Sequence, residues 1–457
     1  MKNRSNHLKA RGHKWLLVPV LLFVLQSCTV QRGLVQQDSL QNRIENDSIL
    51  GNAFVGVSIY DVEQDQYLFD HNSDKIFVPA SNTKLLTTYA SLKYLPDSIP
   101  GWYWQETADS LFLYPNGDPT FFHRDFQQQP LIALMNRVNK PVMIALDERP
   151  GFSRFGAGWP WDYFQSTSVP ERSQMPLYGN FARLRVDAQG ARMVPGYFTQ
   201  FLSAEVPTVN ADAQNYVLTR AENDNQWRAA ASSRSTMARP FTQHSDPMLA
   251  FKLLQDTLSK THPHLRLHLA PNKRRPAANT AGLNVLYTAE KDTVLGVMMK
   301  RSDNFIAEQL LIMAGSEITG RLTDRGAINH ILRTDLANLP DQKNWADGSG
   351  LSRNNQFSPR FYIGLLRQMK DEFGYERVRE ILPHGNQGTL SGYYRGQEDR
   401  IFAKTGTLNG TIALSGYLIA DSGKKLVFSV LVNHHQRSAV DVRRSVEEFL
   451  RTVMKNY

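Results

Sequence analysis

The chain has 457 residues, of which 41% are hydrophobic and 10% aromatic, which is enough for a large core and too much for a disordered chain. Its formal net charge of +9 does not indicate a nucleic-acid-binding protein, because five of the 52 basic residues lie in residues 1–27 and no basic stripe with interleaved aromatic residues follows. No apolar run reaches the roughly 18 residues that a membrane-spanning helix needs.

The amino-terminal residues 1–27 have the layout of a signal peptide. A basic segment precedes an apolar stretch over 15–25, which is too short to cross a bilayer. Leu25-Gln-Ser-Cys28 follows and resembles a bacterial lipobox, in which the chain is cut before the cysteine and that cysteine is acylated. We therefore expect an exported protein held to a membrane by lipid on Cys28, with a polar tether over 28–45. The alternative is a simple cleaved signal followed by an incidental cysteine, and a single cysteine allows no internal disulfide.

Strand signals lie at both ends of the remaining chain. Residues 53–60 and 67–70 are rich in β-branched and aromatic residues around a polar break, and they predict a hairpin. Three further strands are predicted at 401–407, 411–420 and 426–433, and the apolar residues after them recur at helical spacing. Strands at both ends with helices between them favour an α/β domain whose sheet is built from the two termini.

The middle of the chain indicates an insertion. Residues 101–275 contain strand-like pieces of their own, at 111–114, 141–146 and 182–186, separated by turn clusters. We expect one or two smaller domains here, inserted into a discontinuous domain that is formed by 46–100 and 276–457.

Ser81 and Lys84 open a predicted helix with the spacing that places two side chains on one helix face. A serine hydroxyl is a weak nucleophile until a base takes its proton, and a desolvated lysine can act as that base because burial lowers its pKa. Taken alone, the pair is more often a capping serine and a surface lysine. A similar sequence, Ser422–Lys425, lies in a predicted turn.

Two further polar motifs follow along the chain. Ser302-Asp303-Asn304 precedes an apolar helix, where helix capping is the ordinary interpretation, and Ser352–Asn354 has the same pattern. Lys404–Thr407 lies on a predicted strand, where a lysine and two hydroxyls suit a substrate carboxylate and the glycine suits close approach of a substrate backbone. The ordinary interpretation of that lysine is a solubilising edge-strand residue.

In this order, S-x-x-K, S-x-N and K-T-G form the motif set of β-lactamases and penicillin-binding proteins. The chain resembles the low-molecular-mass, class C-type penicillin-binding proteins, which are D-alanyl-D-alanine carboxypeptidases/endopeptidases of the S13 peptidase family. Beyond the three motifs, the resemblance includes Gly117–Thr120, Gly158–Trp161, Asp347–Arg353, Gly388–Leu390 and Phe428–Asn433. It implies an α/β fold: a β-lactamase/transpeptidase-like domain, with an antiparallel sheet flanked by helices, carrying a large inserted region between Ser81 and Ser302.

The resemblance also implies catalytic roles. Ser81 would attack the penultimate D-alanine carbonyl of a peptidoglycan stem peptide ending in D-Ala-D-Ala, and Lys84 would be the general base. Ser302 and Lys404 would pass the proton to the leaving amine, while Asn304 would hold Lys84 and the substrate amide. β-Lactam antibiotics would acylate the same serine, and no cofactor is implied.

Substrate-binding residues follow from the same resemblance. Thr405, Gly406 and Thr407, with the motif lysine, would hold the terminal carboxylate, and the Thr407 N–H would share the oxyanion hole with the nucleophile's N–H. Arg353 and Asp147 match places where relatives bind the side chain of the stem-peptide diamino acid; the ordinary interpretation is a surface salt bridge or a turn cap. We expect Asp347 to be structural, and no metal site at His262, His264 and His268.

Two other functions stay open from the sequence. A serine β-lactamase would use the same nucleophile, although the chain has no recognisable E-x-x-L-N deacylation loop. A non-catalytic cell-wall-binding lipoprotein would keep the fold without the chemistry.

Overall fold

The computed structural model describes residues 36–457, apart from 148–149, 188–189, 206–214, 244, 272, 277–279 and 341–343. The expected signal peptide and Cys28 therefore lie outside the described residues. Within the described part of the chain, no helix is long and apolar enough to cross a membrane.

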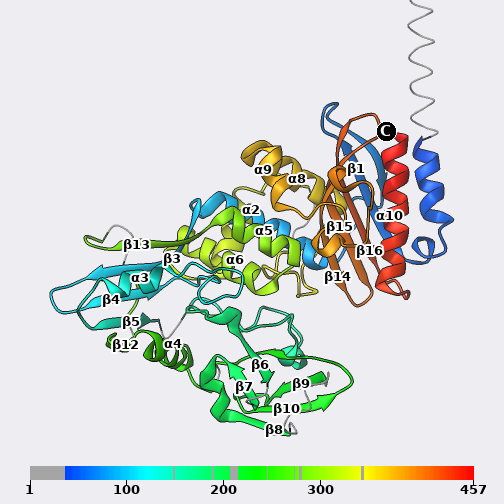
Figure 1. The fold of residues 1–457 in the computed structure, drawn as a ribbon. Coiled ribbons are helices and arrows are strands. Elements are labelled where there is room, and N and C mark those ends of the chain that lie inside the picture. Colours follow the sequence, from blue (N-terminus) through cyan, green and yellow to red (C-terminus); the bar gives the residue numbers. More distant parts are fainter. Residues whose placement is uncertain are drawn as a thin grey trace, which may run out of the picture.

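The larger domain is built on an antiparallel sheet whose strands come from both ends of the chain (Figure 1). The strand order is β14-β15-β16-β1-β2, and the pairing of β1 with β16 joins the two ends, with Val57 opposite Val430. The predicted hairpin and the three predicted carboxyl-terminal strands are all present. Their bounds are β1 (Phe54–Asp61), β2 (Gln66–His71), β14 (Ile401–Leu408), β15 (Thr411–Ile419) and β16 (Lys425–Asn433).

Both faces of this sheet are covered, which explains why β1 and β16 are buried at nearly every position. One face packs on α10 (Ala439–Asn456), the predicted amphipathic helix, and on a helix over 36–45. The other face, with Tyr60 and Val427, packs on a layer of helices. These helices are α2 (Lys84–Tyr94), α5 (Lys291–Arg301), α6 (Asn304–Thr319), α7 (Asp324–Arg333), α8 (Pro359–Phe373) and α9 (Tyr375–Ile381).

A second five-stranded sheet, of order β12-β5-β4-β3-β13, lies in the inserted region. Because β3 begins at Ser98 and β13 pairs with it, this sheet extends beyond the expected insertion bounds of 101 and 275. Its elements are β3 (Ser98–Glu106), β4 (Leu111–Pro115), β5 (Val142–Leu146), β12 (Leu267–Pro271) and β13 (Asn284–Glu290), with α3 (Pro130–Asn136) and α4 (Leu249–Thr261).

Two three-stranded sheets complete the insertion and form a lobe away from the large sheet (Figure 1). An aromatic cluster of Phe198, Trp227 and Phe241 lies in its core. The strands of this lobe are β6 (Phe181–Asp187), β7 (Gly190–Val194), β8 (Leu202–Glu205), β9 (Asn215–Arg220), β10 (Trp227–Ser232) and β11 (Ala238–Pro240).

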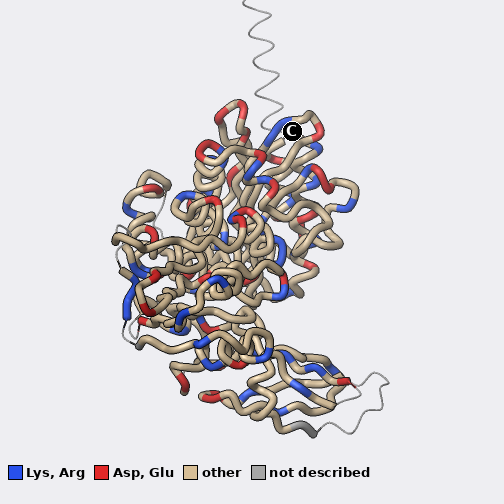
Figure 2. Tube along the Cα trace, turned by 60° about the vertical axis from the view of Figure 1, so that its left-hand side comes forward, with Lys and Arg blue, Asp and Glu red and all other residues tan. Residues whose placement is uncertain are grey.

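Basic and acidic residues are interspersed over most of the chain rather than gathered in one stripe (Figure 2).

Candidate active site

Ser81 lies in a short 3-10 turn, η2 (Ala80–Thr83), that runs directly into α2, so that Lys84 is the first residue of the helix. Ala80 has a φ of 48°, a left-handed conformation that is uncommon outside glycine. The backbone at Gly350 packs directly against Ala80: a Cβ at Gly350 would lie only 1.9 Å from the Ala80 carbonyl oxygen. Such strain costs about 1–3 kcal/mol and persists only where the surroundings enforce it, so the packing holds Ser81 on a defined turn.

The Lys84 side chain is completely buried and its Nζ has three polar neighbours. Nζ lies 2.6 Å from Asn304 Oδ1, 2.6 Å from the Ser349 carbonyl oxygen and 3.0 Å from Ser81 Oγ. The first two oxygens can only accept hydrogen bonds, so two amine hydrogens point to them and the third position points to Ser81. In the neutral amine this third position is the lone pair, which is the geometry of a general base.

Burial lowers the pKa of Lys84 to about 8, and the negative charges of Asp347, Asp303 and Glu308 oppose a larger drop. A lysine with an unshifted pKa would be protonated almost completely at neutral pH. The lowered pKa makes the neutral amine about 300 times more abundant at pH 7 than it would be at the ordinary value.

A second lysine–serine pair lies on the strand side of the site. Lys404 is completely buried on β14, and its Nζ donates to Ser302 Oγ at 2.9 Å and to the Thr405 carbonyl oxygen at 2.7 Å. Burial, together with the positive charges of Lys84 and Arg443, holds the pKa of Lys404 well below its usual value. The structure thus brings Ser81, Lys84, Ser302, Asn304 and Lys404 into one polar cluster.

The packing around Gly406 gives a further reason for a glycine at this position, beside the expected approach of substrate. A Cβ there would lie 2.5 Å from the Pro79 carbonyl oxygen and 3.1 Å from the Ser81 nitrogen. The glycine therefore lets the turn that carries Ser81 pack against β14.

The neighbouring Thr407 hydroxyl accepts a hydrogen bond of 2.6 Å from Arg443 on α10, a residue that the sequence analysis did not single out.

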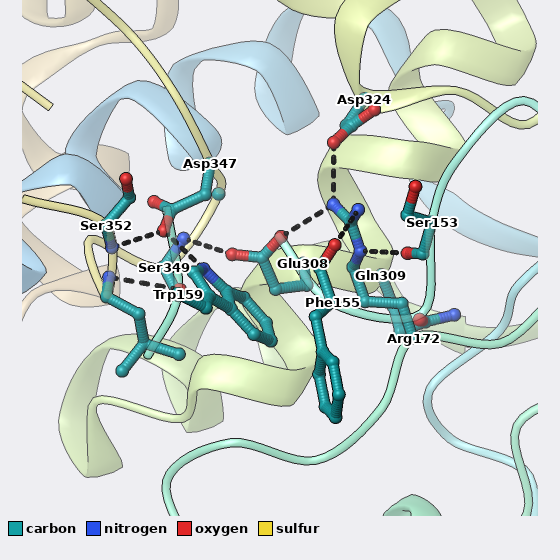
Figure 3. Close-up of polar contacts among 12 residues, drawn as sticks. Ser153, Phe155, Trp159, Arg172, Glu308, Gln309, Asp324, Asp347, Ser349 and Ser352 are labelled. Carbon is teal, nitrogen blue, oxygen red and sulfur yellow. Dashed lines mark hydrogen bonds and ion pairs between the residues drawn. The ribbon is translucent and has the colours of Figure 1, made fainter. Parts of the chain in front are cut away.

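The loop that carries the Ser349 carbonyl is held by buried polar side chains (Figure 3). Asp347 accepts hydrogen bonds from the Gly350 and Ser352 nitrogens, both at 2.7 Å, and from Trp159 Nε1 at 2.8 Å. These contacts support the expected structural role of Asp347. Trp159 comes from the insertion, so the inserted region helps to fix an acceptor of Lys84.

Glu308 and Arg172 hold the same loop from the α6 side (Figure 3). Glu308 Oε1 accepts a hydrogen bond of 2.7 Å from the Ser349 nitrogen. Arg172 Nη1, also from the insertion, lies 3.3 Å from Glu308 and 2.6 Å from Asp324. Burial and the charge of Asp347 raise the pKa of Glu308 to about 7, while Arg172 opposes that rise. We call the carboxylates Glu308, Asp324 and Asp347, together with their partner Arg172, the carboxylate network.

The insertion also reaches the motif residues directly. Asn304 accepts from Lys84 through Oδ1, and its Nδ2 donates to the Ser168 carbonyl oxygen at 2.8 Å. In this structure the Asn304 amide group that was expected to hold substrate is therefore bound to the insertion.

The two weaker substrate-binding candidates lie in different places. Arg353 is exposed and its Nη2 donates to the Asn409 carbonyl oxygen at 2.7 Å, just beyond the end of β14. Asp147 follows β5 in the second sheet, pairs with Arg274 at 3.2 Å and lines a cavity of about 250 Å³ there. No residue of the three motifs lines that cavity.

Among the described residues, no cluster of three or more His, Cys, Asp or Glu side chains could hold a metal ion. His264, one of the three spaced histidines, lies with its Nε2 3.2 Å from Asn136 Oδ1.

Known proteins share the fold and about a quarter or less of the aligned sequence. A D-alanyl-D-alanine carboxypeptidase of Actinomadura sp. (strain R39) is 26% identical over 455 residues, covering 87% of this chain and 80% of the relative. Penicillin binding protein 4 (DacB) of Haemophilus influenzae has a solved structure with a TM-score of 0.67 and 20% identity, covering 91% of this chain and 98% of that one. It has also been solved in complex with a β-lactam. A predatory endopeptidase from Bdellovibrio bacteriovorus, in complex with an immunity protein, matches with a TM-score of 0.51 and 16% identity over 88% of this chain and 93% of that one.

The chain therefore has the expected β-lactamase/transpeptidase-like fold, a mixed α/β fold with antiparallel sheets flanked by helices. The model of the D-Ala-D-Ala carboxypeptidase 3 (S13) family matches residues 36–140 and 204–453. The chain belongs to this family, which confirms the family expected from the three motifs and, with it, the expected class of enzyme, a serine-type D-Ala-D-Ala carboxypeptidase.

Proposed function

We propose that the protein hydrolyses peptidoglycan stem peptides ending in D-Ala-D-Ala through an acyl-enzyme on Ser81. The observation that supports this most directly is the Lys84 amine, whose third polar neighbour at 3.0 Å is the Ser81 hydroxyl. Ser81 Oγ attacks the carbonyl carbon of the penultimate D-alanine while the neutral Lys84 takes its proton. The peptide C–N bond then breaks and the terminal D-alanine leaves.

The strand side of the site supplies the proton path and the anion binding in this proposal. Lys404, hydrogen-bonded to Ser302, relays the proton to the leaving amine. Thr405 and Thr407 hold the terminal carboxylate beside the Lys404 charge, and the backbone N–H groups of Ser81 and Thr407 bind the oxyanion. Water then hydrolyses the ester and frees the serine. Arg353, which bonds to Asn409 just beyond the end of β14, contacts the diamino acid side chain of the stem peptide in this proposal.

β-Lactams place a strained amide where the scissile bond lies, and we propose that they acylate Ser81 in the same way. The complex of the Haemophilus influenzae relative with a β-lactam is the parallel case. We also propose export of this chain and anchoring to a membrane through lipid on Cys28.

Intact mass spectrometry of the purified full-length protein in detergent, after exposure to benzylpenicillin, tests the proposal. We expect one persistent adduct per chain, absent from Ser81→Ala and retained in Ser422→Ala, which removes the serine of the other S-x-x-K sequence. Release of D-alanine from a pentapeptide should follow the same pattern. Consumption of penicillin without an adduct would indicate a β-lactamase, and intact penicillin without an adduct would indicate a non-catalytic binding protein.

A further inference from the structure

The cavity of about 250 Å³ beside Asp147 lies between the second sheet and the carboxyl-terminal end of α6. Helix α6 begins at Asn304, and Ser316, which lines the cavity, lies about 18 Å further along the helix. Since no residue of the three motifs lines the cavity either, it is separate from the proposed active site. Among its described lining residues, basic side chains outnumber acidic ones: Lys273, Arg274, Arg275 and Arg321 against Asp147.

Two of these cations pack on aromatic rings instead of carboxylates. Lys273 Nζ lies 3.4 Å from the centre of the Phe112 ring, and the Arg275 guanidinium carbon lies 4.0 Å from the centre of the Tyr103 ring. Glu317 bonds to the Tyr103 hydroxyl at 2.9 Å. Within the described part of the chain, neither cation forms an ion pair. A ring face attracts a cation but has no net charge, so both positive charges stay available to an anion.

A buried hydroxyl in the wall of the cavity lacks a partner. Tyr114 on β4 lines the cavity and is only 1% exposed, and its hydroxyl has no hydrogen-bond partner among the described residues. Burial raises the pKa of this phenol, so the hydroxyl is protonated at neutral pH and can donate. A buried polar group without a partner costs about 1–3 kcal/mol, which an acceptor bound in the cavity would recover.

Other polar side chains of the walls are already paired. Asp147 pairs with Arg274 at 3.2 Å, and its backbone nitrogen and oxygen bond to the Gln174 amide at 3.0 and 2.9 Å. Ser316 Oγ donates to Asn116 Oδ1 at 2.9 Å. The two ring-bound cations and the Tyr114 hydroxyl remain, and each of them can donate a hydrogen bond. A ligand that fits them is therefore a negatively charged acceptor.

Phosphate matches these donors in charge and in number of oxygens. A phosphate monoester carries a charge of about −1.5 to −2 at neutral pH and three acceptor oxygens, one for each cation and one for the hydroxyl. Arginine binds such a group through two parallel hydrogen bonds, and lysine binds it as a point charge. The volume lies below the roughly 300–1,000 Å³ of pockets for drug-sized ligands, which suits a small molecule. We propose that this cavity binds a phosphate group, either free or carried by a small molecule.

The test is isothermal titration calorimetry of the purified full-length protein, at low salt, with inorganic phosphate and with glucose 6-phosphate. We expect one site per chain, weakened roughly tenfold in Lys273→Gln and in Arg275→Gln and roughly three- to tenfold in Tyr114→Phe, which removes only the hydroxyl. Lys273→Arg keeps the charge and should retain binding. Lys140→Gln removes a cation that pairs with Glu106 beside the same sheet, and it should also retain binding.

A further control separates this cavity from the cations of the active site. Arg443→Gln removes one of those cations and should leave the binding of phosphate unchanged. Tighter binding of glucose 6-phosphate than of inorganic phosphate would support a monoester as the ligand, and the reverse order would support phosphate itself.

Three results would overturn the assignment. The first is a wild-type protein that binds neither probe. The second is an equal loss of affinity in Lys140→Gln and in the cavity variants, which would show a dependence on net charge alone. The third is a loss in Arg443→Gln with full affinity in Lys273→Gln, Arg275→Gln and Tyr114→Phe, which would place the phosphate at the strand side of the active site. None of these results depends on the role of Ser81, so the proposed function is tested separately.

Discussion

The two halves of the active site contain a lysine–serine pair each, but their electrostatic surroundings are opposite. On the helix side, three carboxylates surround Lys84 and hold its pKa near 8 against the effect of burial. On the strand side, the charged groups that act on Lys404 are the cations Lys84 and Arg443, and they lower its pKa further. The first environment suits an amine that alternates between charged and neutral forms. The second suits the binding of an anion, because a negative substrate group would relieve the repulsion between cations.

Removal of Lys84, the lysine on the helix side, should have the largest effect on the rate of acylation. We expect Lys84→Gln to reduce the rate of acylation by benzylpenicillin about 10³- to 10⁴-fold, since Lys84 is the base recorded at the Ser81 hydroxyl among the described residues. In the wild-type protein the rate should rise about tenfold per pH unit below pH 8 and level off above it, because only the neutral amine accepts the proton. Stopped-flow acylation between pH 6 and 10 measures both. A rate that falls as pH rises through this range would contradict the assignment of Lys84 as the base.

The carboxylate network should determine the pH at the midpoint of the acylation profile. Glu308→Gln keeps an acceptor for the Ser349 nitrogen but removes a negative charge that raises the pKa of Lys84. We therefore expect the midpoint of the acylation profile to move to lower pH, by roughly half a unit to one unit. Glu317→Gln, on the same helix but bonded to Tyr103, serves as the matched control. A lower rate with an unmoved midpoint would show that Glu308 acts through structure alone.

On the strand side, Arg443 should affect substrate binding more than chemistry. Arg443→Gln removes a cation beside Thr407, so we expect KM for the pentapeptide to rise about three- to tenfold with a smaller change in kcat. The neighbouring Arg444→Gln breaks a pair with Glu447 and a contact with the Tyr393 ring, and it should leave KM unchanged. Steady-state kinetics of D-alanine release distinguish the two variants. An equal rise of KM in both variants would show that Arg443 does not act at the site.

The smallest effect is expected at Asp147. Its carboxylate pairs with Arg274 in the second sheet, at a cavity that no motif residue lines. Asp147→Asn should change benzylpenicillin acylation and pentapeptide cleavage less than about twofold, the range of a surface ion pair. A large loss of pentapeptide cleavage with normal acylation would show that this residue does bind the stem peptide.

The parts of the site that the sequence predicts are those that depend on local spacing. Ser81 and Lys84 are separated by one helical turn, and the predicted strand over 401–407, which carries Lys404, is part of β14. The contacts between motifs are long-range, and the family resemblance rather than periodicity indicated them. Arg172 and Glu308 were not found, because a charged residue on a helix or in a long insertion is usually solvated, and only tertiary packing shows that these two are buried. Arg443 was not found because its contact with Thr407 joins α10 to β14. The reason for Gly406 was likewise hidden, since it depends on a turn hundreds of residues earlier in the chain.

The pairing of β1 with β16 also sets the order in which the enzyme becomes competent. The ribosome delivers the nucleophile turn early, whereas β14, β15 and β16 come last, just before α10. Until they arrive, β1 has only β2 beside it, and the turn that carries Ser81 lacks β14, against which it packs at Gly406. A chain that lacks these strands thus carries Ser81 and Lys84 without Lys404, Thr405 and Thr407, the residues proposed to bind substrate. We therefore expect hydrolytic activity only in a chain whose carboxyl-terminal strands are in place.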